Sequence, residues 1–151
     1  MALIISALLW LLLLFTRTTA SRIALELPAT AMHELSHWLV AFLTGSRPGF
    51  PSLWPKREGN HWVLGTVTFS PGTWTAGGVA LAPALILMPV AYWGLFVRPK
   101  ELLVSEIIAG LGYGYAAWGC VPSSTDFEIA LKYPLGTTII VGFVFGSLWL
   151  Y

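Results

Sequence analysis

Apolar residues gather in long runs along this chain, and most polar residues lie in the segments between the runs. The runs cover approximately residues 2–16, 23–44, 78–97, 102–121 and 136–151. A helix that spans a bilayer needs about 20 predominantly apolar residues, and several runs approach that length. The pattern therefore predicts a mainly α-helical membrane protein with four to five transmembrane helices.

The first apolar run has two interpretations. It is shorter than an ordinary span, and Thr18 and Ala20 after it resemble the small residues of a signal-peptide cleavage site. A signal peptide also carries basic residues ahead of its apolar core, whereas no lysine or arginine precedes this run. We therefore expect residues 2–16 to be a retained helix.

A more polar segment separates the second run from the third. Residues 46–75 are rich in Gly, Pro and Trp, and two extended stretches flank Glu58-Gly59-Asn60. Glycine and asparagine at such a point favour a turn between two strands. We predict a small β-hairpin at about residues 52–70, within a single domain that comprises residues 1–151.

The composition supports the membrane interpretation and excludes other classes. The chain is 56% hydrophobic and only 10% charged, whereas about a quarter of the residues are charged in ordinary soluble domains. We therefore expect a multi-pass integral membrane protein. The net charge of +1 gives no electrostatic reason to expect a nucleic-acid partner. The single cysteine, Cys120, allows no intrachain disulfide.

The second run contains an H-E-x-x-H motif, formed by His33, Glu34 and His37. Residues four apart on a helix share a face, so the two imidazoles can bind one Zn²⁺ ion at about 2.0–2.1 Å. The glutamate between them can act as general base toward a zinc-bound water. A carboxylate inside a membrane helix costs about 2.5–3.5 kcal/mol, so it normally has a partner or a function. The alternative is that these side chains only form hydrogen bonds between helices.

A catalytic zinc ion usually takes three protein ligands, so the motif needs one more. We predict Asp126, because Pro122-Ser123-Ser124-Thr125 before it favours a helix start that could turn the carboxylate inward. The alternative role for Asp126 is a helix cap or first-turn carboxylate, although either serine could supply that cap instead. The other candidate ligands are His61, Glu106, Glu128 and Cys120.

The motif in an apolar helix, the small β-element after it and the later aspartate together resemble the site-2 protease group of intramembrane zinc metalloproteases. The resemblance covers roughly residues 23–132 and is closest to the compact branch of that group. It implies that His33, His37 and Asp126 bind zinc and that Glu34 is the catalytic base. It also implies that part of His61–Ser70 holds the substrate as an added strand.

These observations predict an intramembrane zinc metalloendopeptidase that hydrolyses peptide bonds in or near transmembrane segments of substrate proteins. Glu34 would take a proton from zinc-bound water as that water attacks the peptide carbonyl. The zinc ion, or a tyrosine such as Tyr113 or Tyr115, would stabilise the oxyanion. Zn²⁺ is the expected cofactor, and a membrane-protein substrate and the lipid bilayer are the expected partners. The alternative is a catalytically silent membrane protein whose zinc site is structural or binds a client.

Overall fold

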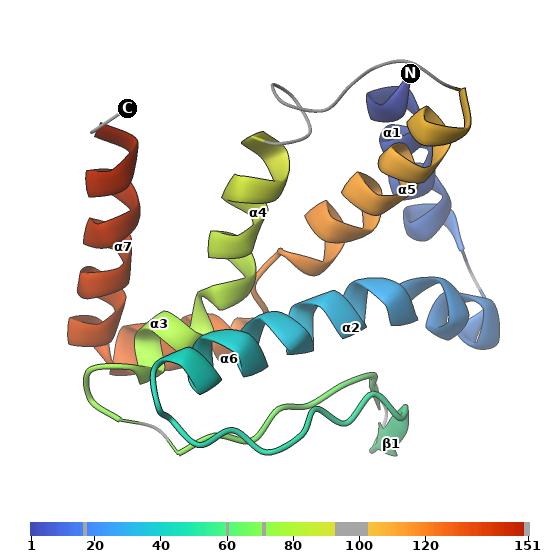
Figure 1. Ribbon diagram of the computed structural model, residues 1–151. Coiled ribbons are helices and arrows are strands. Elements are labelled where there is room, and N and C mark those ends of the chain that lie inside the picture. Colours follow the sequence, from blue (N-terminus) through green and yellow to red (C-terminus); the bar gives the residue numbers. More distant parts are fainter. Residues whose placement is uncertain (17, 60, 71, 93–102, 150–151) are drawn as a thin grey trace.

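A computed structural model describes residues 1–16, 18–59, 61–70, 72–92 and 103–149 of the chain. The described part contains seven helices and one two-stranded sheet (Figure 1). In chain order these elements are α1 (Ala2–Phe15), α2 (Thr19–Leu43), β1 (Lys56–Glu58), β2 (His61–Val63), α3 (Ala76–Ala80), α4 (Ala82–Tyr92), α5 (Leu103–Gly119), α6 (Ser124–Lys132) and α7 (Pro134–Trp149).

Helix α2 is the element around which the others are arranged. Figure 1 shows α2 lying across the molecule, with α4 and α5 rising from one side of it. Helices α3, α4 and α5 all contact α2, and α3 also packs against α6 and α7. A hairpin runs along the opposite side of α2 (Figure 1). The turns of α2 that carry the H-E-x-x-H motif therefore have neighbours on more than one side.

The sequence directs the chain from α2 into the hairpin through a Schellman motif. The amide of Ser46 donates to the carbonyl of Ala41 at 2.8 Å, and the amide of Gly45 donates to Phe42 at 3.1 Å. Gly45 has a φ of 71°, a left-handed conformation that glycine adopts without strain. This arrangement ends the helix and turns the chain back along it.

The hairpin begins and ends close to the positions predicted for it. Strands β1 and β2 are antiparallel, with Arg57 opposite Trp62, and Gly59 has a φ of 60° in the turn between them. Each strand has only three residues. Main-chain hydrogen bonds extend the pairing, since Gly49 donates to Thr68 at 2.8 Å and Ser70 donates to Ser46 at 2.9 Å. We call residues 46–59 and 61–70 the ribbon.

Small residues on α5 allow α1 and α5 to pack closely. A Cβ atom on Gly110 would lie 2.7 Å from the Cβ of Ile5, and one on Gly114 would lie 2.7 Å from the side chain of Leu9. The same approach lets the hydroxyl of Ser6 donate to the carbonyl of Gly110 at 2.7 Å. Helix α5 is thereby held along α1, and its far end reaches α2.

The prediction of transmembrane helices is wrong for the described part of the chain, where no helix combines the length and the apolar character that a span requires. Helix α2 has 25 residues but includes Arg22, Glu26 and Glu34. The longest of the others, α5, has 17 residues. The run at 78–97 is divided between α3 and α4, and its residues 93–97 lie outside the described ranges. The predicted multi-pass fold and integral-membrane localisation are therefore corrected.

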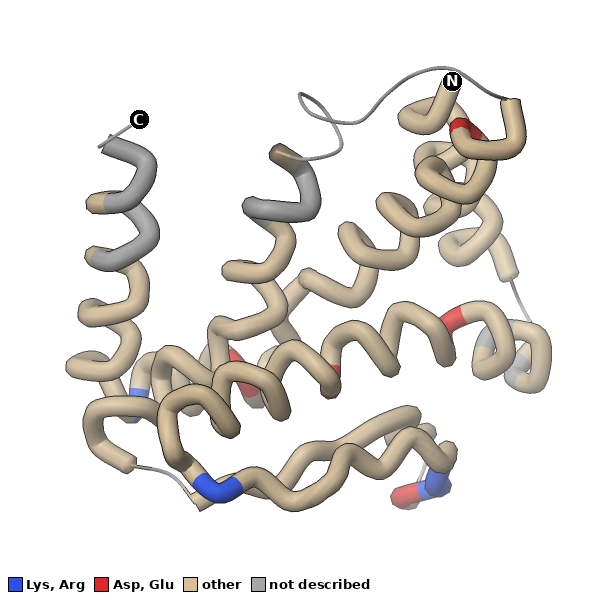
Figure 2. Tube along the Cα trace, viewed as in Figure 1, with Lys and Arg blue, Asp and Glu red and all other residues tan. Residues whose placement is uncertain are grey.

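Apolar residues occupy exposed helix faces as well as the core. The sequences of α1, α4 and α7 contain no lysine, arginine, aspartate or glutamate, and the charges drawn in Figure 2 lie on α2, α5, α6 and the ribbon. On α1, Leu3, Ile4, Leu14 and Phe15 are all more than half exposed. Helices α1, α4 and α7 are thus apolar but shorter than a span, and α1 leaves one apolar face uncovered. The apolar composition that predicted spanning helices corresponds to these features.

Candidate metal centre

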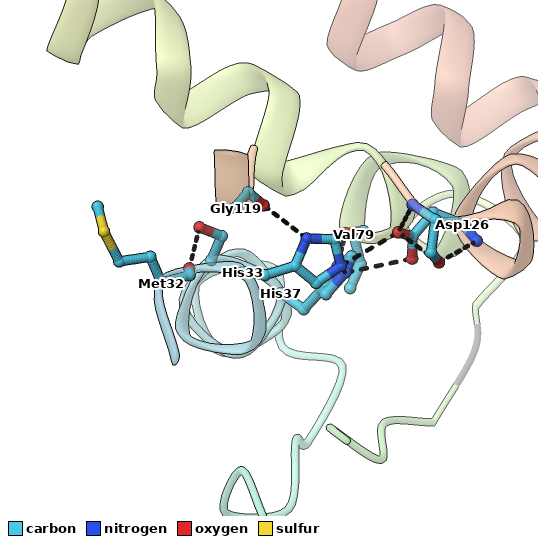
Figure 3. Close-up of polar contacts among 8 residues, drawn as sticks. Met32, His33, His37, Val79, Gly119 and Asp126 are labelled. Atoms are coloured by element: carbon cyan, nitrogen blue, oxygen red, sulfur yellow. Dashed lines mark hydrogen bonds and ion pairs between the residues drawn. The ribbon is translucent and has the colours of Figure 1, made fainter. Parts of the chain in front are cut away.

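Three predicted ligands meet at one point of the described structure. His33 and His37 project from α2, and Asp126 projects from the first turn of α6 toward both imidazoles (Figure 3). Their candidate ligand atoms all lie within 4.8 Å of one another. His37 and Asp126 are buried, and His33 is half-buried. A helix pair separated widely in sequence thus forms a His-His-Asp cluster.

The spacing of these atoms fits a tetrahedral zinc site. The two Nε2 atoms lie 3.0 Å apart, the Nε2 of His33 lies 3.2 Å from Oδ2 of Asp126, and the Nε2 of His37 lies 3.2 Å from Oδ1. Ligand atoms about 2.0–2.1 Å from a tetrahedral zinc ion lie roughly 3.3–3.4 Å apart. The cluster therefore needs only a slight expansion to hold Zn²⁺ with three protein ligands.

Backbone carbonyls fix the orientation of both imidazoles. The Nδ1 of His33 lies 2.7 Å from the carbonyl oxygen of Gly119, and the Nδ1 of His37 lies 2.7 Å from that of Val79 (Figure 3). A carbonyl oxygen can only accept, so each Nδ1 carries the hydrogen. Each Nε2 is then directed at the centre of the cluster as the atom that could bind a metal.

Close packing brings the carbonyl of Gly119 to His33. A Cβ atom at this position would overlap the carbonyl oxygen of Ala29 on α2. Only glycine permits the end of α5 to lie this close to α2. On the other side, Val79 belongs to α3, whose five residues are all buried. The sequence analysis identified neither carbonyl, because every residue has one and only tertiary packing selects these two.

Asp126 caps its helix and also faces the two histidines of the candidate site. It is the N3 residue of α6, and Ser123 is the N-cap. The Asp126 amide donates to the Ser123 hydroxyl at 3.2 Å, and the Ser123 amide donates to the Asp126 carboxylate at 2.7 Å. This capping box starts a helix in a segment that the hydrophobic pattern treated as an interruption. The same carboxylate faces the histidines.

Charge and burial act in opposite directions within the cluster. Burial disfavours the charged form of His33, but hydrogen bonds with Asp126 and Gly119 outweigh burial and raise the pKa of His33 above 6.5. Burial likewise disfavours ionised Asp126, yet hydrogen bonds from His33 and His37 hold the pKa of Asp126 well below its usual range. Asp126 is therefore an anion at neutral pH, as a zinc ligand must be.

Glu34 lies on the ribbon side of the motif. A Cβ atom on Gly65 of the ribbon would lie 2.7 Å from the Cγ of Glu34 and 2.8 Å from the Cγ2 of Thr30. Burial raises the pKa of Glu34, and the charges of His33 and His37 oppose part of that rise. The sequence predicted a hairpin here but carried no signal that Gly65 would be the residue against Glu34.

The other candidate ligands do not join the cluster in the described part of the chain. Glu106 accepts a hydrogen bond from the amide of Ala2 at 3.0 Å, at the contact between α5 and α1. Glu128 is exposed on α6, and Cys120 is buried without adding its sulfur to the group. The side chain of His61 lies outside the described part.

Tyr113 and Tyr115 were the protein groups predicted to stabilise an oxyanion. The hydroxyl of Tyr113 is buried on α5 and has no hydrogen-bond partner among the described residues. Within the described part of the chain, neither tyrosine forms a hydrogen bond with the cluster, so the oxyanion role stays a prediction.

Comparison of the chain with models of protein families, with curated proteins and with solved structures finds no match. The class of this site is therefore defined by its own geometry, as a His-His-Asp centre with an adjacent glutamate.

Asp126→Asn provides a test of the cluster as a zinc site. The amide oxygen of asparagine can still accept from Ser123, but the anionic ligand is lost, so we expect zinc affinity to fall at least about 100-fold. Glu128→Gln, two residues later on the same helix, should leave the affinity unchanged. Competition with a chromophoric zinc chelator measures both variants, and equal affinities would contradict the assignment.

Zinc affinity should also depend on pH through His33. The raised pKa means that a proton competes with zinc for the Nε2 of His33 below that pKa. Affinity should fall about tenfold per pH unit as the pH decreases through this range, and level off above it. Titration calorimetry in buffers of different ionisation enthalpy would measure the proton released, and binding without proton release near neutral pH would contradict the prediction.

Proposed function

We propose that this chain is a zinc-dependent peptidase in which His33, His37 and Asp126 hold the metal and Glu34 is the general base. The convergence of two imidazoles and one carboxylate at 3.0–3.2 Å carries the proposal, because this donor set is typical of a catalytic zinc ion with one open position. The glutamate directly after His33 supplies the remaining group that hydrolysis requires.

The residues of the chain divide the chemistry between them. When bound, the zinc ion would polarise the peptide carbonyl and lower the pKa of water to about 7. Glu34 accepts a proton as water attacks the carbonyl carbon, and the same carboxyl group then donates a proton to the leaving amine. The carbonyls of Gly119 and Val79 hold the imidazoles in the tautomer that binds metal.

The position of the ribbon supports hydrolysis of an extended polypeptide. Gly65 lies within the segment to which the resemblance assigns substrate binding, and this residue packs directly against Glu34. A peptide must be extended for a nucleophile to reach its carbonyl group, and pairing with a strand keeps a peptide extended. The proposal concerns peptide bonds in general. Cleavage within transmembrane segments was predicted together with spanning helices, and it is not part of this proposal.

Glu34→Gln tests the general base. Glutamine keeps the shape of the side chain but cannot accept the proton, so peptide hydrolysis should fall about 10²- to 10⁴-fold while zinc affinity is retained. The substrate is an unfolded, reduced and alkylated model polypeptide, and mass spectrometry of new amino termini reports cleavage. Full activity in this variant would end the proposal.

A matched control and a second outcome sharpen this experiment. Glu26 lies on the same helix, about 12 Å from Glu34 toward the N-terminus, and the Glu26→Gln variant should cleave the substrate like the unaltered chain. Removal of zinc with a chelator should abolish cleavage, and added zinc should restore it. A chain that binds zinc but yields no new termini would support the alternative of a site that binds a client without cutting.

Gly65→Ala tests whether the ribbon holds Glu34 in place. The added methyl group collides with the side chains of Glu34 and Thr30, so Glu34 must shift. A misplacement of about 1 Å can cost about 100-fold in rate, and we expect a loss of this order in kcat/KM with zinc affinity unchanged. Gly112→Ala, where an added Cβ meets nothing within 4 Å, is the control. Unchanged cleavage by Gly65→Ala would exclude this role.

A further inference from the structure

The capping box of α6 treats the two oxygens of Asp126 differently. Both hydrogen bonds from Ser123 go to Oδ2, at 2.7 Å from the amide and 2.8 Å from the hydroxyl. The same hydroxyl accepts from the amide of Asp126 at 3.2 Å. A hydroxyl has one hydrogen to donate and lone pairs to accept with, so one Ser123 side chain can make both bonds.

This asymmetry bears on how the carboxylate meets a metal. A carboxylate oxygen has about two lone-pair sites, and the two bonds from Ser123 use those of Oδ2. Both oxygens face the cluster, since Oδ2 lies 3.2 Å from the Nε2 of His33 and Oδ1 lies 3.2 Å from the Nε2 of His37. Only Oδ1 is free of bonds from Ser123, so Oδ1 is the oxygen whose lone pairs are available to a metal. Rotation of the carboxylate would exchange the oxygens only if both bonds to Ser123 broke.

We propose that Ser123 is a positioning residue, which fixes Asp126 as a monodentate ligand through Oδ1 by holding Oδ2. This inference rests on the zinc site of the proposed function but not on peptide hydrolysis. The helix cap of α6 then has a second role, because the hydrogen bonds of Ser123 that start the helix also select which oxygen of Asp126 is the ligand atom. It also keeps one coordination position from being taken by the second oxygen of Asp126, so that the position stays open for water.

The test is zinc affinity in three variants of Ser123, with the full chain and zinc alone. Ser123→Gly removes the hydroxyl at little cost to the helix cap, whereas Ser123→Ala removes the hydroxyl and also weakens capping. Because the amide of residue 123 still donates, we expect each of these two variants to lower zinc affinity about tenfold. This is the lower end of the loss that follows when a group that hydrogen-bonds a metal ligand is removed. Ser123→Thr keeps the hydroxyl and should restore the affinity. Ser124→Ala, at the next and exposed position, is the matched control.

Two readouts separate positioning of the ligand from simple capping. If zinc affinity follows thermal stability, with Ser123→Ala well below Ser123→Gly, the serine acts only as a cap and the proposal is overturned. The visible spectrum of bound Co²⁺ reports coordination number, and it should change in Ser123→Gly and not in Ser124→Ala. An unchanged spectrum and affinity in Ser123→Gly would equally overturn it. None of these measurements depends on cleavage, so a failure of the peptidase proposal would be seen separately.

Discussion

The Nδ1 atom of each motif histidine is held by a backbone carbonyl from another helix, and the geometry of the centre depends on these two contacts. His33 is bound to Gly119 at the end of α5, and His37 to Val79 in α3. Each contact fixes a ring plane and a tautomer together, so the free Nε2 atoms converge. A carbonyl does not titrate, so this orientation does not change with pH. Two separate helices, α3 and α5, must therefore pack correctly on α2 before the motif could act as a pair of ligands.

Hydrogen bonds connect the atoms that are proposed to bind zinc. The Nε2 of each histidine lies 3.2 Å from an oxygen of Asp126. A proton on His33 satisfies the buried carboxylate, which would be costly if left unpaired. The same contact raises the pKa of His33 and lowers that of Asp126. A proton and a metal would therefore compete for the Nε2 of His33. The described structure thus already brings together the atoms that the proposed zinc site requires, and little reorganisation would accompany binding.

The parts of this site that are local in sequence could be predicted, and the parts that depend on packing could not. His33, Glu34 and His37 follow from helical spacing alone. Asp126 follows from the cap-forming residues before it, and its segment, which lies between two apolar runs, forms a helix of its own. Five apolar runs did give helices, but hydropathy does not show where a helix breaks. The run at 78–97 divides at Leu81, and the membrane spans inferred from it and the other runs were wrong.

Adjacent positions in the motif give the ligand and the base different neighbours. Successive residues on a helix are separated by about 100° around its axis. His33 accordingly meets α5 and α6, whereas Glu34 meets the ribbon through Gly65. Close packing sets both contacts, since a Cβ atom at Gly119 or at Gly65 would collide with α2. A displacement of the ribbon would therefore move the base and leave the three ligands in place. In the proposed function, metal binding and proton transfer would therefore depend on separate parts of the fold, and a substitution could change one without the other.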